Sequence, residues 1–218
     1  MSLTSIIIKK EFMEAIRGKN LGASLSSVLL FLGTFLFTSK ERLLYIFMPY
    51  TPLIIGLMIG FSLSNNIVRE KREGVIETIL CSPMKLKELW LGKTLSISII
   101  STIITILSTY AILSLDNYRL NFITIFYILI TIPLFILASI GLLSLIYFYL
   151  GMRQIQIVNY ILFMGIFLIL FTVFKINVIS EVTWRIISII TLFSTVTFIA
   201  TFLMINYVDV EKLILTID

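Results

Sequence analysis

Long apolar stretches with almost no charge restrict this chain to one kind of fold. A helix that crosses a bilayer takes about 17–25 predominantly apolar residues, and six stretches meet that requirement. They lie at residues 21–38, 43–64, 89–115, 121–150, 154–174 and 184–208. The chain is 59% hydrophobic and 13% charged, whereas a soluble domain has about 45–50% apolar and about 25% charged residues. We therefore predict an all-α membrane protein in which residues 1–218 form one transmembrane domain of six helices.

Basic residues are distributed unevenly between the two sides of these spans. Twelve of the 17 lysines and arginines lie before the first span, in the segment from Arg69 to Lys93, at Arg153 or at Lys212. Basic residues accumulate on the cytoplasmic side of membrane proteins. We therefore expect a multi-pass protein of the cell membrane with both termini in the cytoplasm. Gly151 and Arg153 also favour a turn between the fourth and fifth spans.

Residues 6–19 have the pattern of an amphipathic helix. Apolar residues at helical spacing form one side, namely Ile8, Phe12, Ala15 and Ile16. Lys10 and Glu14 are four positions apart and belong to the other side. A basic amphipathic helix beside a span is typical of segments that lie in the membrane interface. We predict an N-terminal interfacial helix rather than a frayed terminus.

Several function classes lack the residues that they need. The chain has no histidine and one cysteine, Cys81, which excludes histidine metal sites, histidine proton relays and an intrachain disulfide. All twelve carboxylates lie outside the interiors of the spans, which argues against transport driven by protons or sodium and against an aspartate protease within the membrane. The net charge of +5 fits membrane orientation better than a nucleic-acid partner. We expect no catalysis, cofactor or metal in this chain.

Residues 65–93 concentrate charge between two apolar spans, with ten charged residues in this short segment. Three carboxylates recur at helical spacing on one face, at Glu70, Glu73 and Glu77. We predict an amphipathic helix of about three turns that ends near Cys81. Ser82 and Pro83 suit the N-cap and the first position of a following helix. An ordered docking element fits this pattern better than a solvated loop, which would be rich in glycine, proline, asparagine and serine.

Hydroxyl groups repeat every three or four residues along the third span. The members of this stripe are Thr94, Ser98, Ser101, Thr105 and Ser108. The stripe could join neighbouring helices or line a substrate path, and both interpretations stay open. Gly56 and Gly60 form a GxxxG pattern that permits close helix approach. Pro49 and Pro52 are expected to kink the second span, and Pro133 the fourth.

The sequence LGKT at Leu91–Thr94 contains the end of a phosphate-binding loop. That motif requires a glycine five positions before Gly92, where Lys87 stands instead. No strand is predicted before it either. We therefore expect no nucleotide site in this chain, so any ATP that drives it would be bound by a partner.

The segment REKREGVIETILCSPMKLKELWLGK resembles the cytoplasmic segment of ABC-2 type transporter permeases. The family pattern is E-x-x-x-G-T-x-E-x-L-x-x-[ST]-P, followed by a short helix that ends in G-K. The matching positions are Glu70, Gly74, Glu77, Leu80, Ser82, Pro83, Glu88, Gly92 and Lys93. The chain departs from the pattern at Val75. The N-terminal KKEFMEAIRGK is also similar to the family's membrane-entry helix.

The resemblance implies the transmembrane subunit of an ABC exporter. Such a subunit pairs with a second permease, an identical copy or a paralogue, and with a cytoplasmic ABC ATPase that holds ATP and Mg. The resemblance assigns ATPase coupling to Glu70, Gly74 and Glu77. We add Lys71, Arg72 and Glu73 because we expect these neighbours to be exposed. Ser98, Ser101, Thr105 and Ser108 are the residues of the possible substrate path or packing stripe.

The substrate is expected to be amphipathic or hydrophobic, because the spans offer hydroxyl and aromatic groups but no interior charge. A drug, a peptide antibiotic or a lipid would fit. An alternative is a permease like the haem exporter of cytochrome c maturation, although the chain lacks histidine, the natural haem ligand. A non-transporting membrane scaffold or assembly factor is another, and it would need no ATPase and would tolerate charge changes at residues 70–77.

Overall fold

The computed structural model describes residues 3–17, 22, 25–26, 29, 33, 50–81, 84–115, 121–151, 154–161, 164–165 and 182–208. The predicted first span, at residues 21–38, lies almost entirely outside these ranges. So do residues 43–49, the end of the fifth span and the predicted chain restart at Ser82 and Pro83.

The described residues fold into helices and contain no strand. The longer elements are α1 (Leu3–Arg17), α4 (Thr51–Arg72), α6 (Leu86–Leu115), α8 (Ile132–Tyr149) and α10 (Trp184–Met204). The short ones are α5 (Val75–Leu80), α7 (Phe122–Phe126), a π-helical turn η1 (Tyr127–Thr131) and a 3₁₀ turn η2 (Ile205–Tyr207). The all-helical fold class is therefore confirmed for this part of the chain.

Four helical stretches are long and apolar enough to cross a membrane. They run over Thr51–Arg72, Leu86–Ser114, Phe122–Tyr149 and Trp184–Tyr207. These stretches correspond to the predicted second, third, fourth and sixth spans. The complete six-span arrangement stays a prediction, because most of the first span and the end of the fifth lie outside the described residues.

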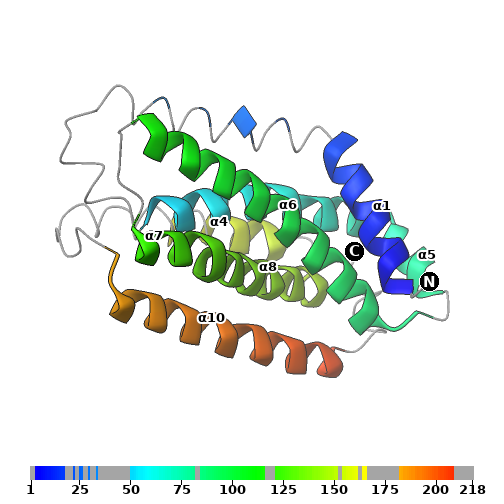
Figure 1. Ribbon diagram of the computed structural model, residues 1–218. Coiled ribbons are helices and arrows are strands. Elements are labelled where there is room, and N and C mark those ends of the chain that lie inside the picture. Colours follow the sequence, from blue (N-terminus) through cyan, green and yellow to red (C-terminus); the bar gives the residue numbers. More distant parts are fainter. Residues whose placement is uncertain are drawn as a thin grey trace.

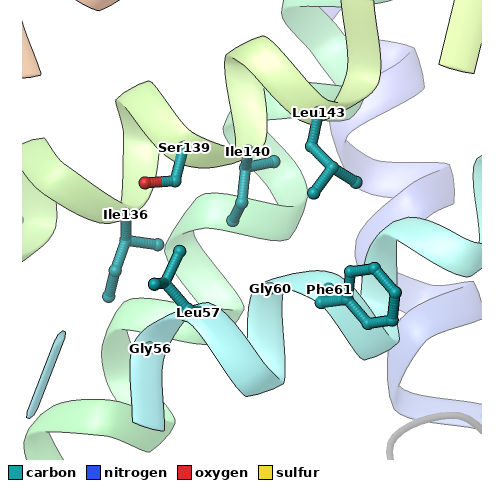
Figure 2. Close-up of a pocket in the computed structure, with 8 residues that line it drawn as sticks. All are labelled: Gly56, Leu57, Gly60, Phe61, Ile136, Ser139, Ile140 and Leu143. Carbon is teal, nitrogen blue, oxygen red and sulfur yellow. The ribbon is translucent and has the colours of Figure 1, made fainter. Parts of the chain in front are cut away.

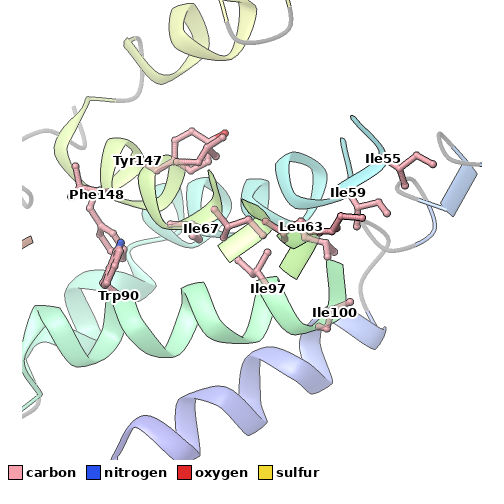
Figure 3. Close-up of a cluster of buried hydrophobic side chains, with 14 of the residues drawn as sticks. Ile55, Ile59, Leu63, Ile67, Trp90, Ile97, Ile100, Tyr147 and Phe148 are labelled. Atoms are coloured by element: carbon pink, nitrogen blue, oxygen red, sulfur yellow. The ribbon is translucent and has the colours of Figure 1, made fainter. Parts of the chain in front are cut away.

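The long helices form a bundle around α8 (Figure 1). Helices α4, α6 and α8 each pack against the other two, α10 packs on α8, and α1 lies across the beginning of α6. The centre is filled by apolar side chains of α4, α6 and α8, among them Ile59, Leu63, Ile97 and Phe148 (Figure 3). Outward-facing residues of α10, such as Leu192 and Phe193, are exposed and apolar, as expected of a surface in contact with lipid.

The prolines act differently from what the sequence suggests. Pro52 lies in the first turn of α4, where a missing backbone N–H leaves no bond unmade, so it does not interrupt that helix. Pro133 lies in the first turn of α8, directly after the π-helical turn Tyr127–Thr131. Its ring excludes the regular bond to the carbonyl of Leu129, so the irregularity expected in the fourth span appears as this π-helical turn.

Helix α4 ends eight residues later than the predicted second span. It continues past Ser64 to Arg72, and Gly74 then adopts a left-handed conformation with φ of +69°. Glycine reaches this region without steric cost and commonly ends helices in this way. The predicted continuous helix with three carboxylates on one face is therefore wrong, because Glu70 belongs to α4 whereas Glu77 belongs to α5.

Candidate functional site: the charged end of the helix bundle

The candidate site lies at the end of the bundle that carries α1, α5 and the beginning of α6, which we call the charged end (Figure 1). Here α4 turns at Gly74 into the short helix α5. We call this turn with its flanking residues, 69–80, the α4–α5 corner. Buried Ile76 holds α5 against the bundle, and the Thr78 hydroxyl donates to the Gly74 carbonyl oxygen at 3.1 Å. The corner is therefore an ordered element with its own packing.

Charged residues at the α4–α5 corner face in two directions. Arg69, Arg72 and Glu73 are exposed, and Arg69 pairs with Glu73 at 3.8 Å. Glu70 and Lys71, between them, are buried. The exposed group could meet a partner, whereas the buried pair can act only within the chain.

Glu70 takes part in an ion cluster, which consists of Lys10, Glu11, Glu70 and Lys93. The ammonium of Lys93, on α6, donates to the carboxylates of both Glu11, on α1, and Glu70, on α4. Lys10 lies 3.6 Å from the other carboxylate oxygen of Glu70. Lys93 is fully buried, and Glu11 and Glu70 are almost fully buried. The cluster thus joins three helices whose residues are far apart in the sequence.

The charges within the ion cluster balance one another. Two ammonium groups face two carboxylates, so the buried acids do not stand uncompensated. Burial raises the pKa of the Glu11 carboxyl above its ordinary value, although Lys93 acts to lower it. Glu14, on the outer side of α1, pairs with Lys10 at 3.6 Å. Each of the three neighbouring carboxylates already pairs with a lysine, so their proximity gives no reason to assign a metal.

Lys71 contacts a different helix. Its ammonium donates to the backbone carbonyl oxygens of Tyr147, Phe148 and Leu150, at 3.3, 3.4 and 2.7 Å. These carbonyls belong to the last turn of α8 and to its C-cap residue Leu150, where no further helical N–H is available to bind them. A cation is also favoured there by the helix dipole. Lys71 therefore fastens the α4–α5 corner to the end of α8.

Trp90 connects the beginning of α6 with α8 and α10. Its indole N–H donates to the Gly141 carbonyl at 3.2 Å, and its ring stacks on Phe198 with centroids 6.1 Å apart. The Lys87 ammonium lies 3.7 Å from the centre of the Phe202 ring, an arrangement that stabilises a cation over an aromatic face. The charged end is therefore joined to α10 as well.

Comparison with known families identifies the family to which the chain belongs. A family model described as ABC-2 family transporter protein matches residues 3–216. The chain belongs to the ABC-2 transporter family. Searches of curated proteins and of solved structures each found no match.

Membership of the ABC-2 family identifies a membrane component of an ABC transporter. Such a permease is not itself catalytic, and the family in general works with an ABC ATPase. The four apolar helices agree with a membrane location.

The residues predicted for ATPase coupling lie at the charged end, but not all of them are placed as expected. Arg72, Glu73 and Gly74 are accessible at the α4–α5 corner, whereas Lys71, which we expected to be exposed, is fully buried. Lys71 is buried because it continues the inner side of α4, four residues after Ile67. The side chain of Glu77 lies outside what the structure describes.

Glu11 and Lys93 were not predicted as site residues, although the sequence contains a signal for each. Glu11 follows the buried Ile7 by four positions, and Lys93 follows the buried Leu89 by four. Residues four apart lie on the same helix face. A charged residue that continues an apolar stripe is therefore a candidate for a buried ion pair.

The hydroxyl stripe of this ABC-2 permease lies inside the bundle. Ser98, Ser101, Thr105 and Ser108 are buried, and all except Ser101 donate to a carbonyl one turn earlier in α6. Ser101 Oγ has no partner among the described residues. The stripe contacts the GxxxG pattern of α4, because a Cβ at Gly56 would lie 3.4 Å from Thr105 Oγ1. This agrees with packing, and the substrate-path interpretation stays a prediction.

Gly56 and Gly60 also allow α8 to approach α4 closely. A Cβ at Gly56 would lie 2.7 Å from Ile136 Cδ1, and one at Gly60 would lie 3.0 Å from Ile140 Cδ1. Figure 2 shows these isoleucines over the two glycines, beside a small apolar pocket that Ser139 and Leu143 also line. The GxxxG pattern therefore serves contacts within this chain.

Gly92 allows α1 to lie directly on α6. A Cβ there would lie 2.8 Å from Ile7 Cγ2 and 3.0 Å from Ile7 Cβ. We expect Gly92→Ala to lower the free energy of unfolding by about 1–3 kcal/mol, the usual effect of overpacking, as measured by titration with sodium dodecyl sulfate in mixed micelles. Gly165→Ala is the control, because none of the described residues lies within 4 Å of its Cβ position. Equal effects of the two changes would contradict the close α1–α6 contact.

Proposed function

We propose that this chain is the transmembrane permease subunit of an ATP-driven exporter. A separate cytoplasmic ABC ATPase, which holds ATP and Mg, docks on the α4–α5 corner. A second permease, an identical copy or a paralogue, completes the transporter. The chain lies in the cell membrane with both termini in the cytoplasm and moves an amphipathic or hydrophobic substrate, such as a drug, a peptide antibiotic or a lipid.

The observation that carries this proposal is the construction of the α4–α5 corner. A short helix, α5, projects from the end of α4 through one left-handed glycine, Gly74, and exposes Arg72 and Glu73 beside it. A charge cluster on a surface can orient a partner of complementary charge. Motion of an ordered short helix can be passed on as rigid-body motion. These are the properties that an ATPase-docking element needs.

The substrate class follows from the polarity of the described helices. Charged residues of α4, α6 and α10 lie near the helix ends, as Arg69, Lys93 and Arg185 do, and the described part of α8 has none. Hydroxyl and apolar groups make up the remainder. A charged substrate would need compensating charge at membrane depth, so an amphipathic or hydrophobic molecule fits better.

The proposal is tested by co-expressing the chain with the ATPase encoded beside its gene. An affinity tag on the chain should recover that ATPase from detergent extracts. Charge reversal of both Arg72 and Glu73 should greatly reduce recovery. Arg185→Glu is the matched control, because Arg185 is exposed in the first turn of α10. That turn contacts α7 through Trp184 and Phe126, at the other end of the bundle (Figure 1). If no ATPase is recovered with the unmodified chain, the chain is not an ATPase-driven permease.

A further inference from the structure

We propose that Lys93 and Lys71 are positioning residues for ATPase coupling, although neither can contact the ATPase. Together with Glu11 and Glu70 they form a junction that ties the α4–α5 corner to α1, α6 and α8. The ends of these helices then move as one unit when the corner is displaced. This inference rests on the proposed function, since it concerns how force received at the corner reaches the bundle.

Two neighbouring residues of α4, Glu70 and Lys71, make the contacts that join α4 to the other helices of the junction. Successive residues of an α-helix point about 100° apart, so Glu70 and Lys71 reach different neighbours. Glu70 binds Lys93 of α6, and Lys93 in turn binds Glu11 of α1. Lys71 binds the carbonyl groups at the end of α8. Displacement of α4 at this point therefore acts on three other helices at once.

Burial separates the junction from the docking surface. Lys71 and Lys93 are fully buried, whereas Arg69, Arg72 and Glu73 on the same corner are exposed. An ATPase can therefore meet the exposed residues without touching the junction. Changes in the junction should leave docking intact and impair only transmission, and this difference makes the inference testable apart from the proposed function.

The use of charge rather than apolar packing supports a role in transmission. Well-packed apolar residues often stabilise a site as well as a buried ion pair does, so stability alone gives no reason for charge here. An ion pair acts over a longer range than an apolar contact, because Coulomb attraction falls only as the inverse of distance. The cluster can thus keep α1 attached to α6 and α4 through small displacements.

The decisive variant is Lys93→Met combined with Glu11→Gln and Glu70→Gln, which removes the buried charges of the ion cluster together and leaves Lys10 paired with Glu14. It is tested in nanodiscs as a complex with the ATPase, beside Lys71→Met. We expect both variants to co-purify with the ATPase at the unmodified level. The chain is expected to change the rate at which the ATPase hydrolyses ATP. In both variants this rate difference should be about tenfold smaller than with the unmodified chain, which is within the usual range of coupling between protein sites. Glu14→Gln, one turn along α1 from Glu11, is the control and should couple normally.

A distance measurement provides a second readout. Spin labels at Cys81, after α5, and at Met13→Cys, on α1, occupy exposed positions on two parts of the charged end. Their distance should stay narrow and constant on addition of ATP in the unmodified complex, and it should broaden in the triple variant. If the triple variant does not accumulate in the membrane, the ATP hydrolysis rate of the complex with Lys71→Met tests the inference instead.

Three outcomes would count against the junction in different ways. Normal coupling in both variants would show that the buried charges only stabilise the fold. Loss of co-purification in the variants, with normal co-purification of the unmodified chain, would show that these residues shape the docking surface instead. Failure of the unmodified chain to bind any ATPase would refute the proposed function, on which the junction depends.

Discussion

Lys93→Met should destabilise the chain by about 3–5 kcal/mol, the usual consequence of removing one partner from a buried ion pair. Lys93 is fully buried between Glu11 and Glu70. Without its ammonium, Glu11 loses the lysine with which it forms an ion pair, and Glu70 keeps the more exposed Lys10. We expect α1 to separate from α6 as water enters to solvate the carboxylates. The free energy of unfolding, from sodium dodecyl sulfate titration in mixed micelles, measures the effect.

Two further variants separate the charge effect from simple loss of packing. Adding Glu11→Gln and Glu70→Gln to Lys93→Met removes the uncompensated charge, so most of the lost stability should return. Glu14→Gln removes the same charge as Glu11→Gln but only from a surface pair, which is worth about 0–1 kcal/mol. If Lys93→Met were as stable as the unmodified chain, the ion cluster could not exist as described.

The membrane-crossing elements were predictable because lipid sets their length and composition. The expected span at 89–115 corresponds to α6 at Leu86–Leu115, and the one at 184–208 corresponds to α10 and η2. Within a bilayer every backbone polar group must be bonded inside the chain. An apolar run of this length therefore leaves few alternatives to a helix, and only its ends depend on local residues.

The α4–α5 corner was predicted as an ordered element, but the helix was expected to continue to about Cys81, whereas it is interrupted at Gly74. The helical spacing of the glutamates from Glu70 to Glu77 favoured one continuous helix. Gly74 follows a last turn rich in basic residues, which is typical of a helix C-terminus. The spacing of the carboxylates predicted a continuous helix, whereas the basic turn and Gly74 predicted a helix end. The helix ends there because Gly74 adopts the left-handed conformation.

The ion cluster could not be derived from local sequence patterns. Lys93 and Glu11 are 82 positions apart, and Lys93 and Glu70 are 23 apart. Periodicity identifies the buried face of one helix but not which helix covers it. The burial of Lys71 could have been predicted from the sequence, because Lys71 extends the series Ile59, Leu63 and Ile67 at intervals of four. The carbonyl groups at the end of α8 that Lys71 binds could be identified only from the packed structure.

Glu77→Lys tests the central claim, that an ATPase acts on this chain through the α4–α5 corner, most directly. Glu77 lies on α5 and matches a carboxylate of the ABC-2 coupling motif. Reversal of its charge should abolish the ATP hydrolysis that depends on the chain, because the new lysine opposes a surface arranged to meet a carboxylate. Membrane insertion should stay normal, since α5 is not one of the apolar spans.

The measurement is the ATP hydrolysis rate of the ATPase in nanodiscs, alone and with the chain. Addition of the unmodified chain, or of Arg185→Glu as the charge-reversal control at the other end of the bundle, should change the rate. With Glu77→Lys the rate should return to that of the ATPase alone. A rate that responds equally to the Glu77→Lys and unmodified chains would contradict the account.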